Sequence, residues 1–231
     1  MSRALCTLAW LAAAWAALAA PPADPTKPFE GGWDKPMDPD GDCKFRRDKG
    51  VLTIEVPAKD HDLGVERGLM NSPRLLRDVE GDFVARVRIG GTFSPSTTST
   101  TTQRIPFVGA GLVLMAGEKT YLRLERAAMF WQGAVKTYAN WELRQDGQWV
   151  LRGDASVCPL EDKETYVRLE RRGDKLLAAV SHGGKKWSEL KPLEVKLPAK
   201  LKLGLAAGTT STEPFLPGFD QFELEKGRKR G

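Results

Sequence analysis

The sequence predicts an all-β fold, a sandwich of two antiparallel sheets. Short segments in which apolar and polar residues alternate recur along the chain, for example at 51–56 and 83–89. Tight turn signals, such as Asp146-Gly147 and Gly173-Asp174, separate neighbouring segments. No long stretch has helical periodicity. Many short strands joined by tight turns within one domain indicate two packed sheets.

The two ends of the chain lie outside this predicted domain. Residues 1–20 combine Arg3, an apolar run over 8–18 and a small-x-small pattern at 17–19, which are the features of a cleaved signal peptide. A membrane span needs about 20 apolar residues, so this run is too short, although an uncleaved N-terminal anchor is the alternative. We expect a protein that is secreted, or periplasmic and in the cell envelope, with no membrane attachment after signal cleavage.

The remaining boundaries follow from composition and charge. Residues 21–32 are rich in Pro and Gly and are expected to form a linker, residues 33–225 the β-sandwich domain, and residues 226–231 a basic disordered tail. The formal net charge of +5 equals the charge of five residues: Arg3, Lys226, Arg228, Lys229 and Arg230. The rest of the chain is therefore neutral, and no nucleic-acid partner is expected.

The predicted strands follow one another at short spacing. They cover 51–56, 83–89, 109–115, 121–126, 135–144, 149–157, 166–171, 175–181, 201–207 and 219–224. Residues 109–115 are continuously apolar, as in a strand buried on both faces. Residues 66–77 have no strand pattern, and Pro73 argues against a helix there. From residue 121 to residue 190 the pattern is that of an antiparallel meander.

A hexapeptide occurs twice with little change. Residues 121–126 are Tyr-Leu-Arg-Leu-Glu-Arg, and residues 166–171 are Tyr-Val-Arg-Leu-Glu-Arg. Alternation places the aliphatic residues of each copy on one face of a strand, toward the core. The Tyr, the first Arg and the Glu of each copy lie on the other face. We expect the copies to be two strands of one sheet with matching faces.

The polar face of this sheet is the strongest candidate for a ligand site. Tyr138, Asn140 and Glu142 share it with Tyr121, Arg123 and Glu125 if Trp141 and its alternating neighbours face the core. Rings and planar hydrogen-bonding groups are the mixture that binds sugars. Tyr121 and Tyr138 would stack on a sugar, while its hydroxyls would bond to Arg123, Glu125, Asn140 and Arg168. The alternative is a ladder of cross-strand ion pairs that binds nothing, each pair worth under about 1 kcal/mol.

Two further clusters could carry chemistry. Asp38, Asp40 and Asp42 have a spacing that can supply oxygen ligands to calcium, although Cys43 and Lys49 occupy positions where an EF-hand needs Gly and Glu. An acidic turn is the alternative. Asp60-His61-Asp62 could orient a general base or form a polar turn.

The two cysteines that follow the predicted signal peptide, Cys43 and Cys158, leave two interpretations open. After export they could form a disulfide, or they could remain separate buried thiols.

The stretch from 33 to 224 resembles a poorly characterised secreted family of the concanavalin A-like lectin/glucanase superfamily, the family that includes the yeast regulation-of-enolase protein. The resemblance rests on residues 38–43, 71–76, 81–83, 121–126, 183–187, 203–207 and 219–222. It implies a jelly-roll sandwich of two antiparallel sheets, one of them concave. Related glucanases use Glu-x-Asp-x-x-Glu. Here Glu80-Gly-Asp82 is followed by Ala85 at the last position, which argues against retaining hydrolysis.

These observations favour an exported, lectin-like and non-catalytic module that binds carbohydrate weakly on the Tyr/Arg/Glu face. A glycoside hydrolase or lyase of the same superfamily, with Glu125 and Glu142 as its carboxylates, is one alternative. A structural or protein-interaction domain without a small ligand is the other. The sequence sets neither the ligand nor the oligomeric state.

Overall fold

The computed structural model describes residues 20–227. Apart from one 3-10 turn, these residues form strands and loops, and the predicted all-β sandwich of two antiparallel sheets is confirmed. Nearly all of the predicted signal peptide and residues 228–231 of the predicted tail lie outside the described residues. Within 20–227 no helix has the length and apolar character that crossing a membrane requires.

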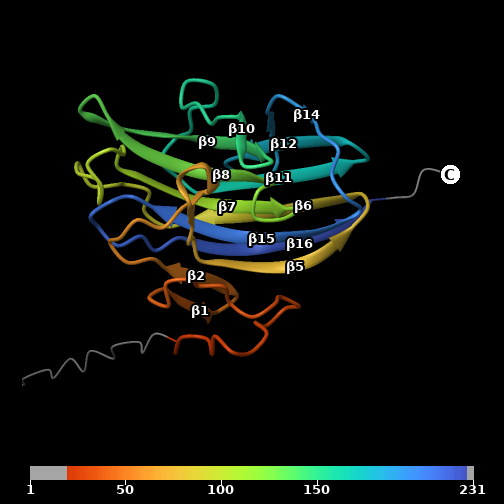
Figure 1. Cartoon of the computed structure of the whole chain (residues 1–231), viewed down its shortest axis with the longest axis horizontal. Helices are drawn as coiled ribbons and strands as arrows, with labels where there is room; N and C mark the ends of the chain where they lie inside the picture. The colour runs from red at the N-terminus through yellow and green to blue at the C-terminus, as the bar shows by residue number, and fades with distance from the viewer. Residues whose placement is uncertain (1–19, 228–231) are drawn as a thin grey trace, which may run out of the picture.

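Two large sheets stack face to face, one behind the other in Figure 1. The first sheet runs β10-β9-β8-β7-β15-β5, and the second runs β1-β2-β16-β6-β11-β12-β13, with β14 also paired to β12. The strands of the first sheet are β5 (Arg74–Glu80), β7 (Phe107–Met115), β8 (Tyr121–Trp131), β9 (Ala134–Gln145), β10 (Gln148–Leu151) and β15 (Lys200–Thr209). Those of the second are β1 (Lys44–Asp48), β2 (Val51–Glu55), β6 (Phe83–Gly90), β11 (Thr165–Arg172), β12 (Lys175–Ser181), β13 (Ser188–Glu189), β14 (Leu193–Glu194) and β16 (Gly218–Lys226).

A small structure covers the outer face of the first sheet. It consists of residues 60–70, here called the cap, and contains β3 (Leu63–Gly64), η1 (Val65–Arg67) and β4 (Leu69–Met70). Leu63 of the cap packs in a second apolar cluster with residues of the sheet that include Leu76, Val113 and Tyr121. The sandwich is therefore three layers deep at this point.

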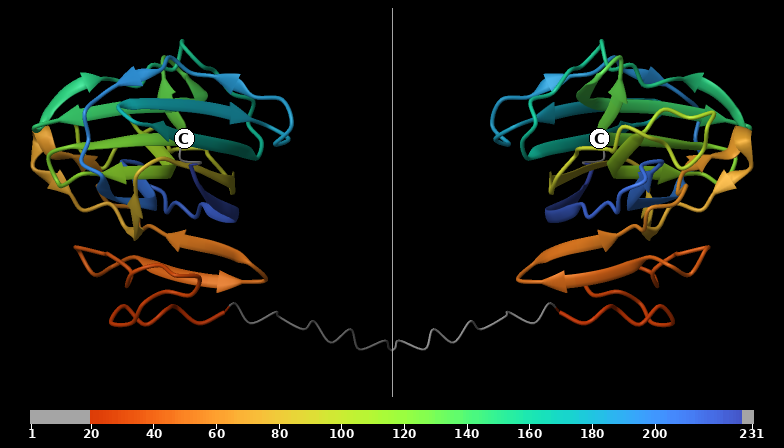
Figure 2. Two further views of the ribbon diagram at one scale, coloured as in Figure 1. Left: turned by 90° about the vertical axis from the view of Figure 1, so that its right-hand side faces the viewer. Right: turned by 90° about the vertical axis from the view of Figure 1, so that its left-hand side faces the viewer.

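The N-terminal segment lies along one side of the sandwich, next to the hairpin of β1 and β2 (Figure 2). The amide of Ala23 donates to the carbonyl of Phe45 at 2.6 Å, and Phe29 and Trp33 are buried in the core. Part of segment 21–32, which the Pro and Gly content indicates as a linker, thus contributes to the sandwich, because Phe29 adds apolar area that a linker would leave in water.

Alternation correctly predicts which residues of the repeated hexapeptide enter the core. Leu122 and Leu124 of β8, and Val167 and Leu169 of β11, are all at most 1% exposed and belong to the main apolar cluster. The two copies are nevertheless in different sheets, which corrects the expectation of one sheet and of a single meander. The chain crosses from the first sheet to the second between β10 and β11, so the two apolar faces meet across the core.

Two other expectations are corrected. The strand expected at 149–157 ends at Leu151, where a register shift between Trp149 and Leu151 interrupts pairing with β9. Residues 66–77, expected to lack strand structure, contain β4 and the start of β5. The first three residues of β5, from Arg74 to Leu76, are all buried because the cap covers their outer face, so this part of the strand has no alternation to detect.

Cys43 and Cys158 are free thiols in the structure, each partly buried. Of the two interpretations that the sequence leaves open, the structure has separate thiols.

The core packing predicts a specific loss of stability. Leu124→Ala should lower the free energy of unfolding by about 2–5 kcal/mol, because the removed methyl groups leave a cavity in the interface between the sheets. Leu216→Ala, at a position that is 51% exposed, is the matched control and should have little effect. Urea denaturation of the two variants measures both values, and equal losses would contradict the assigned core.

Candidate functional site

Arg123 of β8 lies at the centre of a buried cluster of charges. Its side chain is 4% exposed and meets three carboxylates: Nη1 is 2.8 Å from Asp62 Oδ1 and 3.6 Å from Glu142 Oε2, and Nη2 is 3.0 Å from Glu125 Oε2. The register of β8 and β9 places Arg123 opposite Glu142. A guanidinium stays charged in a protein, so burial requires such partners.

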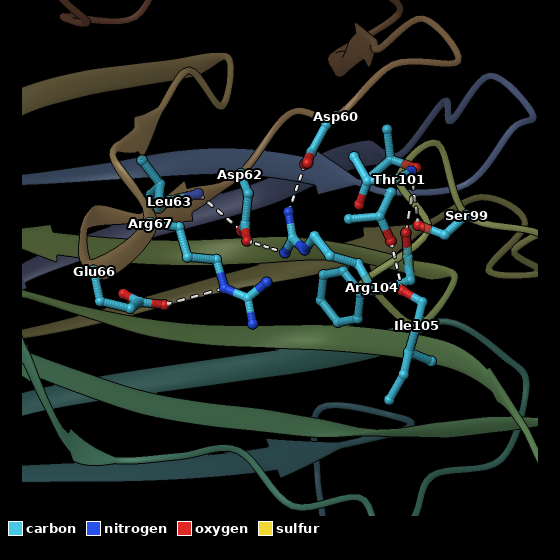
Figure 3. Close-up of polar contacts among 12 residues, drawn as sticks. Asp60, Asp62, Leu63, Glu66, Arg67, Ser99, Thr101, Arg104 and Ile105 are labelled. Carbon is cyan, nitrogen blue, oxygen red and sulfur yellow. Dashed lines mark hydrogen bonds and ion pairs between the residues drawn. The ribbon is translucent and has the colours of Figure 1, made fainter.

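The cap holds one side of this cluster in place. Asp62 is bonded to Arg123 and also to Arg104, whose Nη1 donates to Asp60 Oδ1 at 2.5 Å. Figure 3 shows Arg104 reaching between Asp60 and Asp62. The hydroxyl of Tyr121 donates to the carbonyl of Leu63 at 2.8 Å and fixes the cap to β8.

A second set of charges continues toward β10. Arg144 donates from Nη1 to Glu142 Oε2 at 2.8 Å and from Nε to Glu66 Oε2 at 2.9 Å. Its guanidinium carbon lies 3.5 Å from the centroid of the Trp149 ring. Glu66, on the cap, is also 3.9 Å from Arg67 Nε (Figure 3).

Two glycines allow backbone to pack directly on this cluster. A Cβ at Gly208 would lie 2.9 Å from the carbonyl oxygen of His61, so a side chain there would displace the cap. A Cβ at Gly153 would lie 1.6 Å from Asn140 Oδ1. That oxygen is buried without a hydrogen-bond partner, while Asn140 Nδ2 donates to Glu125 Oε2 at 2.8 Å.

Burial and pairing shift the pKa values of these groups in opposite directions. Burial opposes ionisation of Asp62, but Arg123 and Arg104 outweigh it and lower its pKa to about 2. Burial, with a contribution from Glu142, raises the pKa of Glu125 despite Arg123. Burial raises the pKa of Tyr121 to about 12 and that of Tyr138 further. The hydroxyls therefore stay protonated, and Asp62 stays ionised, at neutral pH.

Six of the seven ligand-binding residues predicted from the sequence come together on this face, in two groups. Tyr121, Glu125 and Asn140 are at most 2% exposed and lie beneath the cap or the loop at Gly153. The others, which line a pocket, are Arg123, Tyr138 and Glu142.

Arg168 is the exception and corrects the prediction. It projects from β11 of the second sheet, where its Nη2 is 2.7 Å from Glu189 Oε1 and its guanidinium carbon is 4.7 Å from the Trp187 ring. Because the two copies of the hexapeptide share a core and not a face, Arg123 and Arg168 project away from each other.

The pocket has a volume of about 310 Å³. Its lining combines charged side chains, which include Arg104, Glu142 and Arg144, with apolar ones, which include Ile105, Phe107, Met129 and Trp149. Arg104, Arg144 and Trp149 are not among the residues predicted from the sequence. Arg144 continues the alternation of Asn140 and Glu142 and could have been found, whereas Arg104 follows an irregular polar loop that gives no such signal.

The acidic segment of residues 38–42 lies elsewhere. Asp38 accepts from the amides of Gly41 and Cys43, which makes it the anchor of a turn. Asp40 accepts from Asn71 Nδ2 at 2.8 Å, and Asp42 from Lys59 Nζ at 2.6 Å. Calcium binding by these three residues stays a prediction.

Comparison with known proteins supports the fold. No protein-family model and no curated protein matches the chain. Among solved structures, a functionally unknown protein from Saccharomyces cerevisiae is 16% identical with a TM-score of 0.59, covering 80% of this chain and 92% of that one.

Two hydrolase structures share the fold over part of their length. A xylan β-1,4-xylosidase from Bacillus halodurans is 14% identical, with a TM-score of 0.61 over 87% of this chain and 38% of that one. The GH43 protein BlXynB from Bacillus licheniformis is 17% identical, with a TM-score of 0.55 over 80% of this chain and 37% of that one. At these identities the likeness shows a shared β-sandwich, in agreement with the jelly-roll fold that the sequence resemblance implies.

Removal of the central guanidinium should be costly. Arg123→Met is expected to destabilise the fold by about 3–5 kcal/mol, because it leaves buried carboxylates without a counter-charge. Arg168→Met removes a half-exposed pair and should cost under about 1 kcal/mol. Denaturant unfolding of both variants provides the test, and equal costs would show that Arg123 is not the centre of the cluster.

The lowered pKa of Asp62 predicts a pH dependence. A carboxyl with a pKa of about 2 in the folded protein and about 3.9 unfolded contributes stability above about pH 4 and loses it as the pH falls toward 2. The contribution is on the order of 2 kcal/mol at neutral pH, at about 1.4 kcal/mol per pKa unit. The stability difference between the wild type and Asp62→Asn should therefore shrink between pH 4 and pH 2. A difference that does not change over this range would contradict the assignment.

Proposed function

We propose that this protein is an exported, lectin-like module that binds carbohydrate weakly, and without catalysis, in the pocket between the cap and β10. The observation that carries the proposal is the composition of this pocket. Its aromatic side chains, Phe107 and Trp149, can contact the apolar face of a pyranose, and its charged groups, Arg104, Glu142 and Arg144, can bond to hydroxyls.

The charged groups of the pocket are held in position before any ligand arrives. Arg144 is fixed by Glu142 and Glu66, and Arg104 by Asp60 and Asp62. Fixed donors lose little conformational entropy when a ligand binds. The same internal pairs compete with sugar hydroxyls for the guanidinium groups, which supports weak binding.

The arrangement of carboxylates supports a binding role over hydrolysis. Retaining hydrolysis needs a nucleophile and an acid about 5–5.5 Å apart on either side of the bond to be cleaved. Glu125 is buried against Arg123 and Asn140 and does not line the pocket, while Glu142 is paired with Arg144. Glu125 is therefore not placed to act with Glu142 as the second carboxylate of a catalytic pair in this pocket.

The fold and the N-terminal sequence add support of a more general kind. The β-sandwich is shared with parts of two proteins whose names place them among hydrolases of carbohydrate, although a fold is compatible with many functions. Residues 1–20 have the pattern of a signal peptide, which supports export to where polysaccharides are found.

A glycan array with the full chain, followed by calorimetric titration of the best ligand, tests the proposal. Trp149→Ala should weaken binding at least about tenfold, since losing an aromatic contact costs about 1.4 kcal/mol or more. Trp187→Ala is a matched control, because Trp187 is also half-buried and lies against an arginine, but on the opposite sheet. Binding should be unchanged in this variant.

The outcomes separate the alternatives. No binding to any glycan, or equal losses in the two tryptophan variants, would overturn the proposal. Release of reducing ends from a polysaccharide, abolished in Glu142→Gln with the fold intact, would instead support a hydrolase.

A further inference from the structure

We infer that Asp42, Cys43 and His61 form a site for a divalent transition-metal ion such as Zn²⁺. The three side chains come from the turn before β1 and from the cap, and one ligand atom of each lies within 4.8 Å of the others. His61 Nε2 is 3.2 Å from Asp42 Oδ1, and Cys43 Sγ is 3.6 Å from the same oxygen. The site is separate from the proposed carbohydrate pocket and does not depend on it.

His61 provides the observation that points to an ion. Its side chain is fully buried, and its Nε2 has no hydrogen-bond partner. Nδ1 lies 3.4 Å from the carbonyl oxygen of Asn71, and because a carbonyl only accepts, this contact places the proton on Nδ1. The lone pair of Nε2 then faces Asp42 Oδ1 at 3.2 Å, a repulsive contact that a proton on Nε2 or a metal ion bound by both groups would relieve. A backbone carbonyl behind a ligating histidine is a common arrangement in metal sites.

The other two ligands are also oriented by the fold. Lys59 Nζ binds Asp42 Oδ2 at 2.6 Å, and so the second oxygen, Oδ1, is the one turned toward His61 and Cys43. The amide of Cys43 donates to Asp38 Oδ2 at 2.8 Å, which fixes the turn that presents the thiol. Asn71 connects Asp40 to the carbonyl of Asp60 and holds the segment next to His61.

The chemistry of the donors selects the class of ion. One thiolate, one imidazole and one carboxylate suit Zn²⁺ or Co²⁺, whereas calcium takes oxygen ligands. On binding, the S–H bond of Cys43 breaks, a metal–sulfur bond forms and the proton passes to solvent. Cys43 also lines a pocket of about 720 Å³ next to the N-terminal segment.

Such an ion would connect two parts of the chain. His61 lies between Asp60 and Asp62, whose carboxylates bind Arg104 on the other side of the segment. Metal binding at His61 would thereby fix the cap to the turn before β1.

Titration of the full chain with Co²⁺ tests the site. We expect one equivalent to produce a near-ultraviolet thiolate-to-cobalt charge-transfer band and Zn²⁺ to abolish it. Cys43→Ser should lose the band and Cys158→Ser, the matched control with the second partly buried thiol, should keep it. Zn²⁺ should also raise the Tm of the wild type and of Cys158→Ser, but not that of Cys43→Ser.

Several results would overturn the inference. One is the absence of both the band and the Tm shift in the wild type. Another is loss of the band in Cys158→Ser but not in Cys43→Ser. Displacement of Co²⁺ by an equal concentration of Ca²⁺ would indicate an all-oxygen site at Asp38, Asp40 and Asp42 instead. Circular dichroism of Cys43→Ser distinguishes loss of metal binding from loss of fold.

Discussion

The first sheet is organised around the need to neutralise one buried guanidinium. Arg123 cannot lose its charge at neutral pH, and its strand neighbours alone do not enclose it. The third carboxylate comes from Asp62, which brings the cap onto the sheet, and Asp62 in turn brings in Arg104. The absence of a side chain at Gly208, on strand β15 of the same sheet, lets the cap backbone approach closely enough. Removing one partner of such a cluster leaves the others buried and charged.

The repeated hexapeptide shows that the surroundings of a strand's polar face depend on whether another layer of the structure covers that face. Both copies bury their aliphatic residues equally well in the shared core. Arg123 of the first copy is enclosed by the cap, while its counterpart in the second copy, Arg168, lies half-exposed beside Glu189. The same local pattern therefore produces a rigid charged centre on one sheet and an ordinary surface pair on the other.

A feature of this protein could be predicted from the sequence where it is set locally, and not where it is set by distant parts of the chain. Alternation is a local property, so most strands and their core faces follow from the sequence, as does the gathering of Tyr138, Asn140 and Glu142 beside Arg123. Which sheet a strand joins, and whether a further layer covers its outer face, are set by segments that are distant in the sequence. The sequence therefore did not reveal that Arg168 belongs to the other sheet, that the start of β5 is buried on both faces, or that Arg104 completes the cluster.

The short strands at one edge of the sandwich limit how this protein can pair with other chains. At one margin of the sandwich, β13 and β14 have two residues each, and β10 has four residues and an irregular register. A long regular margin exposes a row of unpaired amides and carbonyls that can recruit a foreign strand and start aggregation. Here the edge strands are too short and too irregular to pair with a strand of another chain. At high local concentration this lowers the tendency of a β-rich domain to aggregate.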